Sequence, residues 1–263
     1  MDRLTASTGE RFGYMWADRL TPIVSPVSYH LELMRERLGA PPLRGRVLDA
    51  GCGEGIDLGS IALDGSVRAV GLELSAGGVR SSRARAPHAA VIQGDLRFLP
   101  LRDAAFDCVY SYGVVHHTTD PAGVVRELTR ALKPGGTMLV YLYEDFADRS
   151  LVWRSSLEAI RLLRQLTTRL PPKTLMALCR AVGPLIFAAC VWPSRHFRWA
   201  KQLPYHHCPT AASVAPDLYD RLAAPLEYRY SRESATQLLA SAGLTIRAVA
   251  QERGWMLWSE KPA

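Results

Sequence analysis

A glycine-rich segment directly after a short apolar run is the feature that most restricts the fold of this chain. The run Val47–Ala50 has the length and composition of a buried strand, and Gly51, Gly53 and Gly55 follow it before a helical stretch. Glycines at such a turn let the backbone bend sharply and come close to a ligand. The segment therefore predicts the first βα unit of an α/β domain, with a ligand beside the loop.

Strand-like and helix-like segments alternate after this loop. Apolar runs predict further strands at residues 67–74, 89–93, 106–111 and 137–143. Before the last strand, Asp120 is suited to cap a helix that Pro121 begins and that Pro134–Gly136 ends. This alternation predicts an α/β fold with a doubly wound, mostly parallel (Rossmann-like) sheet in residues 46–143, covered by helices on both faces.

The two ends of the chain are expected to complete this domain. Residues 1–45 contain helical stretches and predict an N-terminal helical cap. In residues 206–263, Ser231 is suited to cap a helix through Ala242, and a pair of strands is expected at residues 244–251 and 255–259. The pair would add an antiparallel edge to the sheet.

An acidic residue follows the glycine loop at a spacing typical of adenosine recognition. Glu73 ends the second predicted strand, where a carboxylate can accept hydrogen bonds from both ribose hydroxyls. Two residues argue against a dinucleotide: Ile56 replaces the last glycine of the fingerprint, and the Asp49 carboxylate would repel a pyrophosphate. Asp49 could instead pair with an amino-acid ammonium group. The pattern favours S-adenosylmethionine.

Five motifs in order resemble the class I S-adenosylmethionine-dependent methyltransferases, most closely the small-molecule branch called methyltransferase type 11, which includes ubiquinone-biosynthesis enzymes. They are the loop 48–55, Glu73, Gly94–Asp95, Ser111–His117 and Leu132–Gly136. The resemblance covers residues 46–143, whereas residues 144–230 match nothing diagnostic. The Phe12–Trp16 segment also resembles the amino-terminal cap of some members.

The resemblance implies S-adenosylmethionine as cofactor, S-adenosylhomocysteine as product, and a role for each matching residue. The glycines would line the methionine and ribose part of the cofactor, with Asp49 near its amino group and Glu73 on the ribose hydroxyls. Asp95 would accept from the adenine amino group beside Leu96, and Ser111 would approach the methionine end through its backbone. The implied cofactor-binding residues are Asp49, Gly51, Cys52, Gly53, Gly55, Glu73, Leu74, Asp95, Leu96 and Ser111.

The expected function is transfer of the cofactor's methyl group to an oxygen or carbon of a small, apolar, lipid-like or natural-product molecule. Such transfer mainly requires that the acceptor be aligned and water excluded. An oxygen acceptor would need a base, for which His117, Tyr205 and His206 are the candidates, and a carbon acceptor could need none. The run Tyr205–Cys208 cannot easily converge on one ion, so no metal site is predicted.

Residues 144–205 interrupt the alternation and are expected to form a basic, apolar helical lid. An amphipathic helix is predicted at residues 152–170, with Val152, Ala159, Leu163, Leu166 and Leu170 on one face. The uncharged run Ala181–Pro193 is too short to span a membrane and suggests a buried or interfacial helix. Ten basic and two acidic residues give residues 147–202 a charge of +8, against +7 for the chain.

This charge predicts peripheral contact with an anionic membrane through residues 147–202, with a solvated helix face as the alternative. Five scattered cysteines without a C-x-x-C pair, and no signal peptide, predict a cytoplasmic protein. An RNA methyltransferase would need a basic groove across the cofactor face or an appended RNA-binding domain, and neither is visible, so no nucleic-acid partner is expected. A non-catalytic S-adenosylmethionine-binding protein stays open as an alternative.

Overall fold

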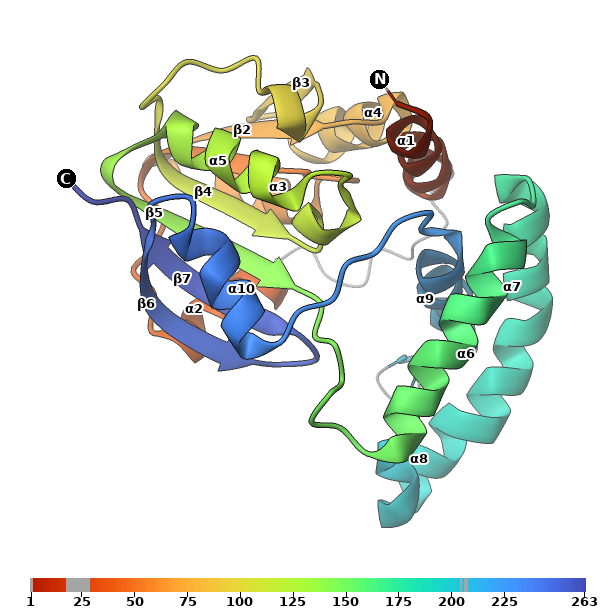
Figure 1. The fold of residues 1–263 in the computed structure, drawn as a ribbon. Coiled ribbons are helices and arrows are strands. Elements are labelled where there is room, and N and C mark those ends of the chain that lie inside the picture. The colour runs from red at the N-terminus through yellow and green to blue at the C-terminus, as the bar shows by residue number, and fades with distance from the viewer. Residues whose placement is uncertain (1, 18–28, 204, 206–207) are drawn as a thin grey trace. The chain divides into compact units, whose positions relative to one another are not determined.

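The computed structural model describes residues 2–17, 29–203, 205 and 208–263. The described residues form two compact units (Figure 1). Residues 2–9, 29–145 and 226–263 make up an α/β unit, and residues 10–17 with the described part of 146–225 make up a helical unit. Helix α1, Arg3–Ala17, is divided between the two units.

The α/β unit is built on one seven-stranded sheet with the order β3-β2-β1-β4-β5-β7-β6. Only β7 runs antiparallel, pairing with β5 on one side and β6 on the other. This confirms the predicted α/β class, the mostly parallel sheet and its antiparallel C-terminal edge. The strands are β1 Gly45–Ala50, β2 Val67–Glu73, β3 Ala90–Gln93, β4 Phe106–Tyr112, β5 Leu132–Leu142, β6 Thr245–Gln251 and β7 Trp255–Glu260.

Helices cover both faces of the sheet because successive strand residues point to opposite sides. Leu48 of β1 is buried in the core under α5 (Pro121–Ala131) and α10 (Arg232–Ala240). Its neighbour Val47 is buried in the other core, under α2 (Tyr29–Leu38), α3 (Ile56–Ala62) and α4 (Ala76–Arg85). Part of the sequence expected to form a cap, α2, is therefore an ordinary covering helix of the sheet.

Helix α5 begins as predicted but ends earlier. The Asp120 side chain accepts a hydrogen bond from the Gly123 N–H at 2.8 Å, and Pro121 is the first helical residue. The helix ends at Ala131 rather than at Pro134–Gly136, because Leu132 already pairs with Phe106 of β4. The Pro–Gly–Gly run lies inside β5, where an irregularity in the pairing with β4 accommodates it.

The helical unit contains α6 (Leu151–Thr167), α7 (Pro172–Ile186), a π-helical stretch (Phe187–Val191), α8 (Trp192–His196), the 3₁₀ segment Arg198–Gln202 and α9 (Ala211–Ala223). From α7 to α8 the helix is continuous over Pro172–His196, 25 residues, despite Pro184. It is long and apolar enough to cross a membrane by length and composition alone. The sequence analysis considered only the uncharged run Ala181–Pro193, whereas the helix that contains this run begins at Pro172 and ends at His196.

The predicted amphipathic helix exists as α6, but its expected apolar face is not the buried one. Leu163 and Leu166 of that face are 49% and 62% exposed, whereas Leu157 is buried. Two polar residues of α6 form hydrogen bonds to the end of α9. The Arg164 guanidinium donates to the Arg221 carbonyl, and the Thr167 hydroxyl donates to the Leu222 carbonyl at 2.8 Å. These bonds to the end of α9 orient the helix, which sequence periodicity cannot reveal.

Candidate functional site

The glycine loop connects β1 to α3 at the carboxyl edge of the sheet, where α/β domains bind ligands. Gly51, Gly53 and Gly55 have φ angles of 84°, 54° and 86°, in the left-handed region that disfavours side chains. A Cβ at Gly51 would lie 2.5 Å from both Cγ atoms of Val114, and one at Gly55 would lie 2.6 Å from the Cα of Ser82. The loop conformation and its close packing therefore both require glycine.

Glu73 ends β2 beside this loop, as the sequence predicted, and its carboxylate is held by a network of donors. Oε2 accepts from the Gly53 N–H at 3.2 Å. Oε1 accepts from the Ser75 N–H at 2.8 Å and from the Ser75 hydroxyl at 2.7 Å. Burial raises the pKa of Glu73 above its ordinary value, against the lowering effect of these hydrogen bonds. The carboxylate is thus fixed in one orientation next to the glycine loop.

Three residues that sequence analysis did not single out support Glu73 and the loop. Ser75 caps α4 by accepting from the Gly78 N–H. A Cβ at Gly78 would lie 2.7 Å from the Cγ of Glu73, so a side chain there would displace the carboxylate. The Ser82 hydroxyl donates to the Gly53 carbonyl at 2.8 Å and lies 3.3 Å from the Cys52 sulfur. Only the cap Ser75, directly after a predicted strand, carried a signal in the sequence.

Asp49 lies in β1 just before the loop and is almost fully buried. Its Oδ2 atom has no hydrogen-bond partner among the described residues. Burial raises the pKa of Asp49 well above its ordinary value, and the nearby carboxylates of Asp57 and Glu73 raise it further. Asp57, in the first turn of α3, accepts a 2.7 Å hydrogen bond from the Tyr110 hydroxyl. A cationic ligand group beside Asp49 would relieve both the burial and the repulsion.

Asp49→Asn is expected to stabilise the ligand-free protein at neutral pH. The pKa of Asp49 is higher in the folded than in the unfolded protein, so ionisation destabilises the fold as pH rises above 3.8, the ordinary aspartate value. The asparagine variant lacks this penalty, and its advantage should vanish as pH falls below that value. Urea unfolding of both proteins across the pH range measures the difference. A variant that is less stable at every pH would contradict this electrostatic account.

Asp95 follows β3 and is engaged by a neighbouring arginine. It caps the 3₁₀ turn Leu96–Phe98, and Arg97 binds both its carboxylate oxygens, at 2.6 Å for the closest pair. Burial raises the pKa of Asp95, but the hydrogen bonds from Arg97 lower it more, leaving it below the ordinary value. Arg97 also pairs with Asp2, which lies just before α1. The neighbouring Leu96 is buried in the core, away from solvent.

Two further predicted residues lie at this edge. The Ser111 hydroxyl donates to the Ala50 carbonyl at 2.9 Å, which ties β4 to β1 and leaves only its backbone for a ligand. Leu74, directly after Glu73, packs close to α1: a Cβ at Gly9 would lie 3.2 Å from its side chain. The first turns of α1 therefore lie over the end of β2, beside the glycine-loop edge.

Of the candidate bases that the structure describes, His117 lies in the α/β unit. It ends the 3₁₀ turn Val115–His117 after β4, is 8% exposed, and its Nδ1 lies 2.8 Å from the Leu226 carbonyl. A carbonyl can only accept, so Nδ1 donates this hydrogen bond, and a neutral ring in this tautomer could accept only through Nε2. This tautomer makes His117 suited to take a proton through Nε2.

The other two candidates lie elsewhere. Tyr205 belongs to the helical unit, where the Arg221 guanidinium lies 5.1 Å from its ring centre. Burial raises the pKa of Tyr205 to about 12, which disfavours the phenolate that a base would need. His206 lies outside the described residues. Of the two candidates that the structure describes, His117 is the one that follows a strand at the carboxyl edge of the sheet.

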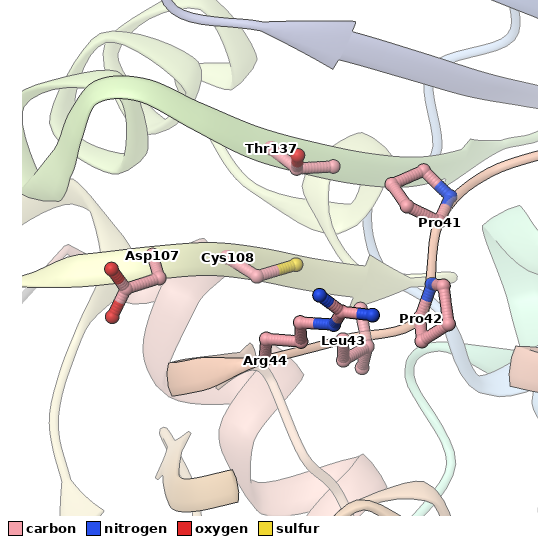
Figure 2. A pocket seen from close by; sticks show the side chains of 7 residues that line it. All are labelled: Pro41, Pro42, Leu43, Arg44, Asp107, Cys108 and Thr137. Carbon is pink, nitrogen blue, oxygen red and sulfur yellow. The ribbon is translucent and has the colours of Figure 1, made fainter. Parts of the chain in front are cut away.

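A cavity of about 300 Å³ opens near the amino ends of β1 and β4, away from the carboxyl ends that carry the glycine loop (Figure 2). Figure 2 shows its lining on the segment before β1 and on β4 and β5: Pro41, Pro42, Leu43, Arg44, Asp107, Cys108 and Thr137. Its carboxylate, Asp107, is already paired with Lys133 at 2.6 Å and accepts from the Arg46 N–H at 2.8 Å. Because this group is neutralised and the cavity is far from the glycine loop, we do not assign the site to it.

Comparison with known proteins agrees with this geometry. Residues 48–140 match the family model described as a methyltransferase domain. A relative from Mycolicibacterium smegmatis, named a probable S-adenosylmethionine-dependent methyltransferase, is 40% identical over 109 residues, which cover 41% of this chain and 42% of the relative. The 27-O-demethylrifamycin SV methyltransferase of Amycolatopsis mediterranei is 35% identical over 108 residues, covering 38% and 40%. The chain thus spans less than half the length of these relatives.

Solved structures share the fold over most of the chain. A SAM-dependent methyltransferase from Aquifex aeolicus aligns with a TM-score of 0.54 at 12% identity, covering 94% of this chain and 97% of that one. A geranyl diphosphate methyltransferase, solved with GPP and sinefungin, aligns with a TM-score of 0.52 at 12% identity, covering 89% and 77%. At this identity the likeness concerns the fold alone.

Proposed function

Because residues 48–140 form a class I S-adenosylmethionine-dependent methyltransferase domain, we propose that this protein transfers the methyl group of S-adenosylmethionine to a small, apolar acceptor. The observation that carries the proposal is the glycine-rich turn, with Gly51, Gly53 and Gly55 in left-handed conformations, beside the fixed Glu73 carboxylate at the carboxyl ends of the strands. A turn whose three glycines let the backbone approach a ligand, beside an oriented acceptor for hydroxyl groups, fits a ribose-bearing ligand.

The residues of this edge suit the cofactor's separate parts. The buried Asp49 oxygen that has no partner among the described residues would accept from the cofactor's ammonium group. Glu73 would bind the ribose hydroxyls, and the backbone of Gly51, Gly53 and Ser111 would approach the methionine part. Asp95 would contact the adenine amino group, and its pairing with Arg97 would hold it in place. Cys52, Gly55, Leu74 and Leu96 would complete the cofactor-binding set.

The bound sulfonium supplies an activated methyl group, so the protein's main contribution is to orient the acceptor and exclude water. His117 would remove a proton from an oxygen acceptor through Nε2, while the Leu226 carbonyl holds Nδ1–H in place. The rifamycin relative supports a small-molecule acceptor, and a carbon acceptor would need no base.

Ligand stabilisation and methyl transfer test this proposal together. S-adenosylhomocysteine at about 100 times its Kd should stabilise the protein by about 2.7 kcal/mol, or roughly 5–10 °C in Tm, because it binds only the folded state. NAD should leave Tm unchanged. Incubating the full chain with a deuterated methyl donor and cell extract should then yield a labelled small molecule in untargeted mass spectrometry. Stabilisation by NAD alone would refute the cofactor, and stabilisation without any labelled product would favour a non-catalytic binding protein.

A further inference from the structure

The long helix of the helical unit carries an exposed apolar stripe. Leu178, Val182 and Leu185 recur at spacings of four and three residues, which places them on the same side of α7, and the exposed Ala189 and Trp192 continue the apolar surface through the π-helical stretch into α8. Leu185 is 70% exposed and Trp192 is 53% exposed. The members, all exposed, are Leu178, Val182, Leu185, Ala189 and Trp192; we call them the apolar stripe.

A neighbouring side of the same helix is packed into the core of its own unit. Leu175, Met176 and Cys179 are buried there, packed with residues of α9. A Cβ at Gly183 would lie 3.5 Å from the Ala215 backbone nitrogen, so the two helices approach closely at this point. A helix held along one side cannot be surrounded by lipid without breaking this packing. The geometry therefore favours a helix that lies along a surface over one that crosses a membrane.

Basic residues border the exposed side of α7 that contains the apolar stripe, with the small exposed residues Ala177, Ala181 and Pro184 between them and the stripe. Lys173 and Arg180 are both exposed and, seven residues apart, lie on the same side of α7. Beyond α8, Phe197 and Trp199 are exposed, with ring centres 6.1 Å apart. Apolar residues bordered by cations, with tryptophan at the end, are typical of helices that lie in the boundary between lipid headgroups and acyl chains.

We propose that the apolar stripe, with Lys173 and Arg180, docks the helical unit on an anionic membrane surface with the helix parallel to the membrane plane. The charge of the surrounding segment fits this occupant: residues 147–202 hold ten basic and two acidic residues. A second copy of the same face would instead bring like charges together. The proposal does not depend on the methyltransferase activity, because it rests on the helical unit alone.

Flotation of the full chain with lipid vesicles tests the proposal. The protein should float with vesicles of phosphatidylcholine mixed with phosphatidylglycerol, less so as salt is added, and weakly or not at all with phosphatidylcholine alone. The double variant Lys173→Glu/Arg180→Glu should reduce binding by about 30-fold or more, since each basic residue near such a surface contributes about a factor of five to ten. Leu185→Glu should reduce vesicle binding at least about tenfold, because it replaces a leucine that would be buried in the lipid phase with a charged residue.

Leu63→Glu is the matched control, because Leu63 is 71% exposed in the α/β unit and outside the stripe. It should float as the unmodified protein does, and circular dichroism should show all variants folded. Equal binding to neutral vesicles, no binding to either, or an equal loss in Leu63→Glu would overturn the proposal. The proposal would also be overturned if the protein bound no vesicles, formed a dimer in light scattering, and lost that dimer on Leu185→Glu. A second copy of the chain would then be what covers the apolar stripe. Resistance of the membrane-bound protein to alkaline extraction would indicate a spanning helix and would also overturn it.

Discussion

Gly55→Ala is expected to lower the free energy of unfolding by about 2–5 kcal/mol and to abolish binding of S-adenosylhomocysteine. Gly55 has a φ of 86°, where a side chain costs about 1–2 kcal/mol. The new Cβ would also lie 2.6 Å from the Cα of Ser82, and overpacking of this kind costs roughly 1–3 kcal/mol. The clash is with backbone, so it can be relieved only by moving α4 away from the loop. Urea unfolding followed by circular dichroism measures the loss.

Gly65→Ala provides the matched control for this loss. A Cβ at Gly65 meets no atom within 4 Å, and its φ is not in the left-handed region. The substitution should therefore be neutral or stabilise the protein by about 0.4–1 kcal/mol, by restricting the unfolded chain. Equal destabilisation by both substitutions would show that the glycine loop is not specially constrained.

Glu73→Ala is expected to weaken binding of S-adenosylhomocysteine by about 10- to 150-fold, or roughly 1.5–3 kcal/mol, the range for hydrogen bonds to a charged group. The substitution removes the proposed acceptor for the ribose hydroxyls. It also leaves the Gly53 and Ser75 N–H groups without their carboxylate acceptor, so the loop should lose order as well. Isothermal titration calorimetry on the folded variant measures the affinity.

Glu260→Ala is the control for a glutamate at the end of a strand. Glu260 ends β7 and pairs with Arg247 at 2.7 Å, away from the glycine loop. Its removal should leave the affinity unchanged. An unchanged affinity in folded Glu73→Ala would show that the ribose contact has been assigned to the wrong residue, even if the cofactor is right.

The parts of the fold that could be predicted are those encoded by neighbouring residues. The glycine loop, the cap at Asp120 and the cap at Ser231 depend on residues within one turn of each other, and all three are present. The strands follow from short apolar runs in the same way. The ends of elements were harder to predict: α5 stops before the Pro–Gly–Gly run because pairing with a distant strand begins at Leu132.

Orientation of the inserted helices could not be predicted, because periodicity identifies an apolar face without saying what it contacts. The face of α6 that contains Leu163 and Leu166 is exposed, since Arg164 and Thr167 bind the end of α9 across more than fifty residues of sequence. The uncharged run Ala181–Pro193 likewise gave no sign that its helix begins at Pro172.

The sequence by itself determined which residues gather at the ligand edge, since parallel strands must all present their carboxyl ends there. Glycines at the first turn and an acid after the second strand therefore predict an adenosine site without any knowledge of long-range contacts. Only the tertiary structure decided the state of each acidic group. The Arg97 guanidinium donates hydrogen bonds to the Asp95 carboxylate, and Ser75 and Gly53 donate the hydrogen bonds that orient the Glu73 carboxylate. Asp49 keeps a buried oxygen without a partner among the described residues, because burial and hydrogen bonding depend on which distant segments pack around a side chain.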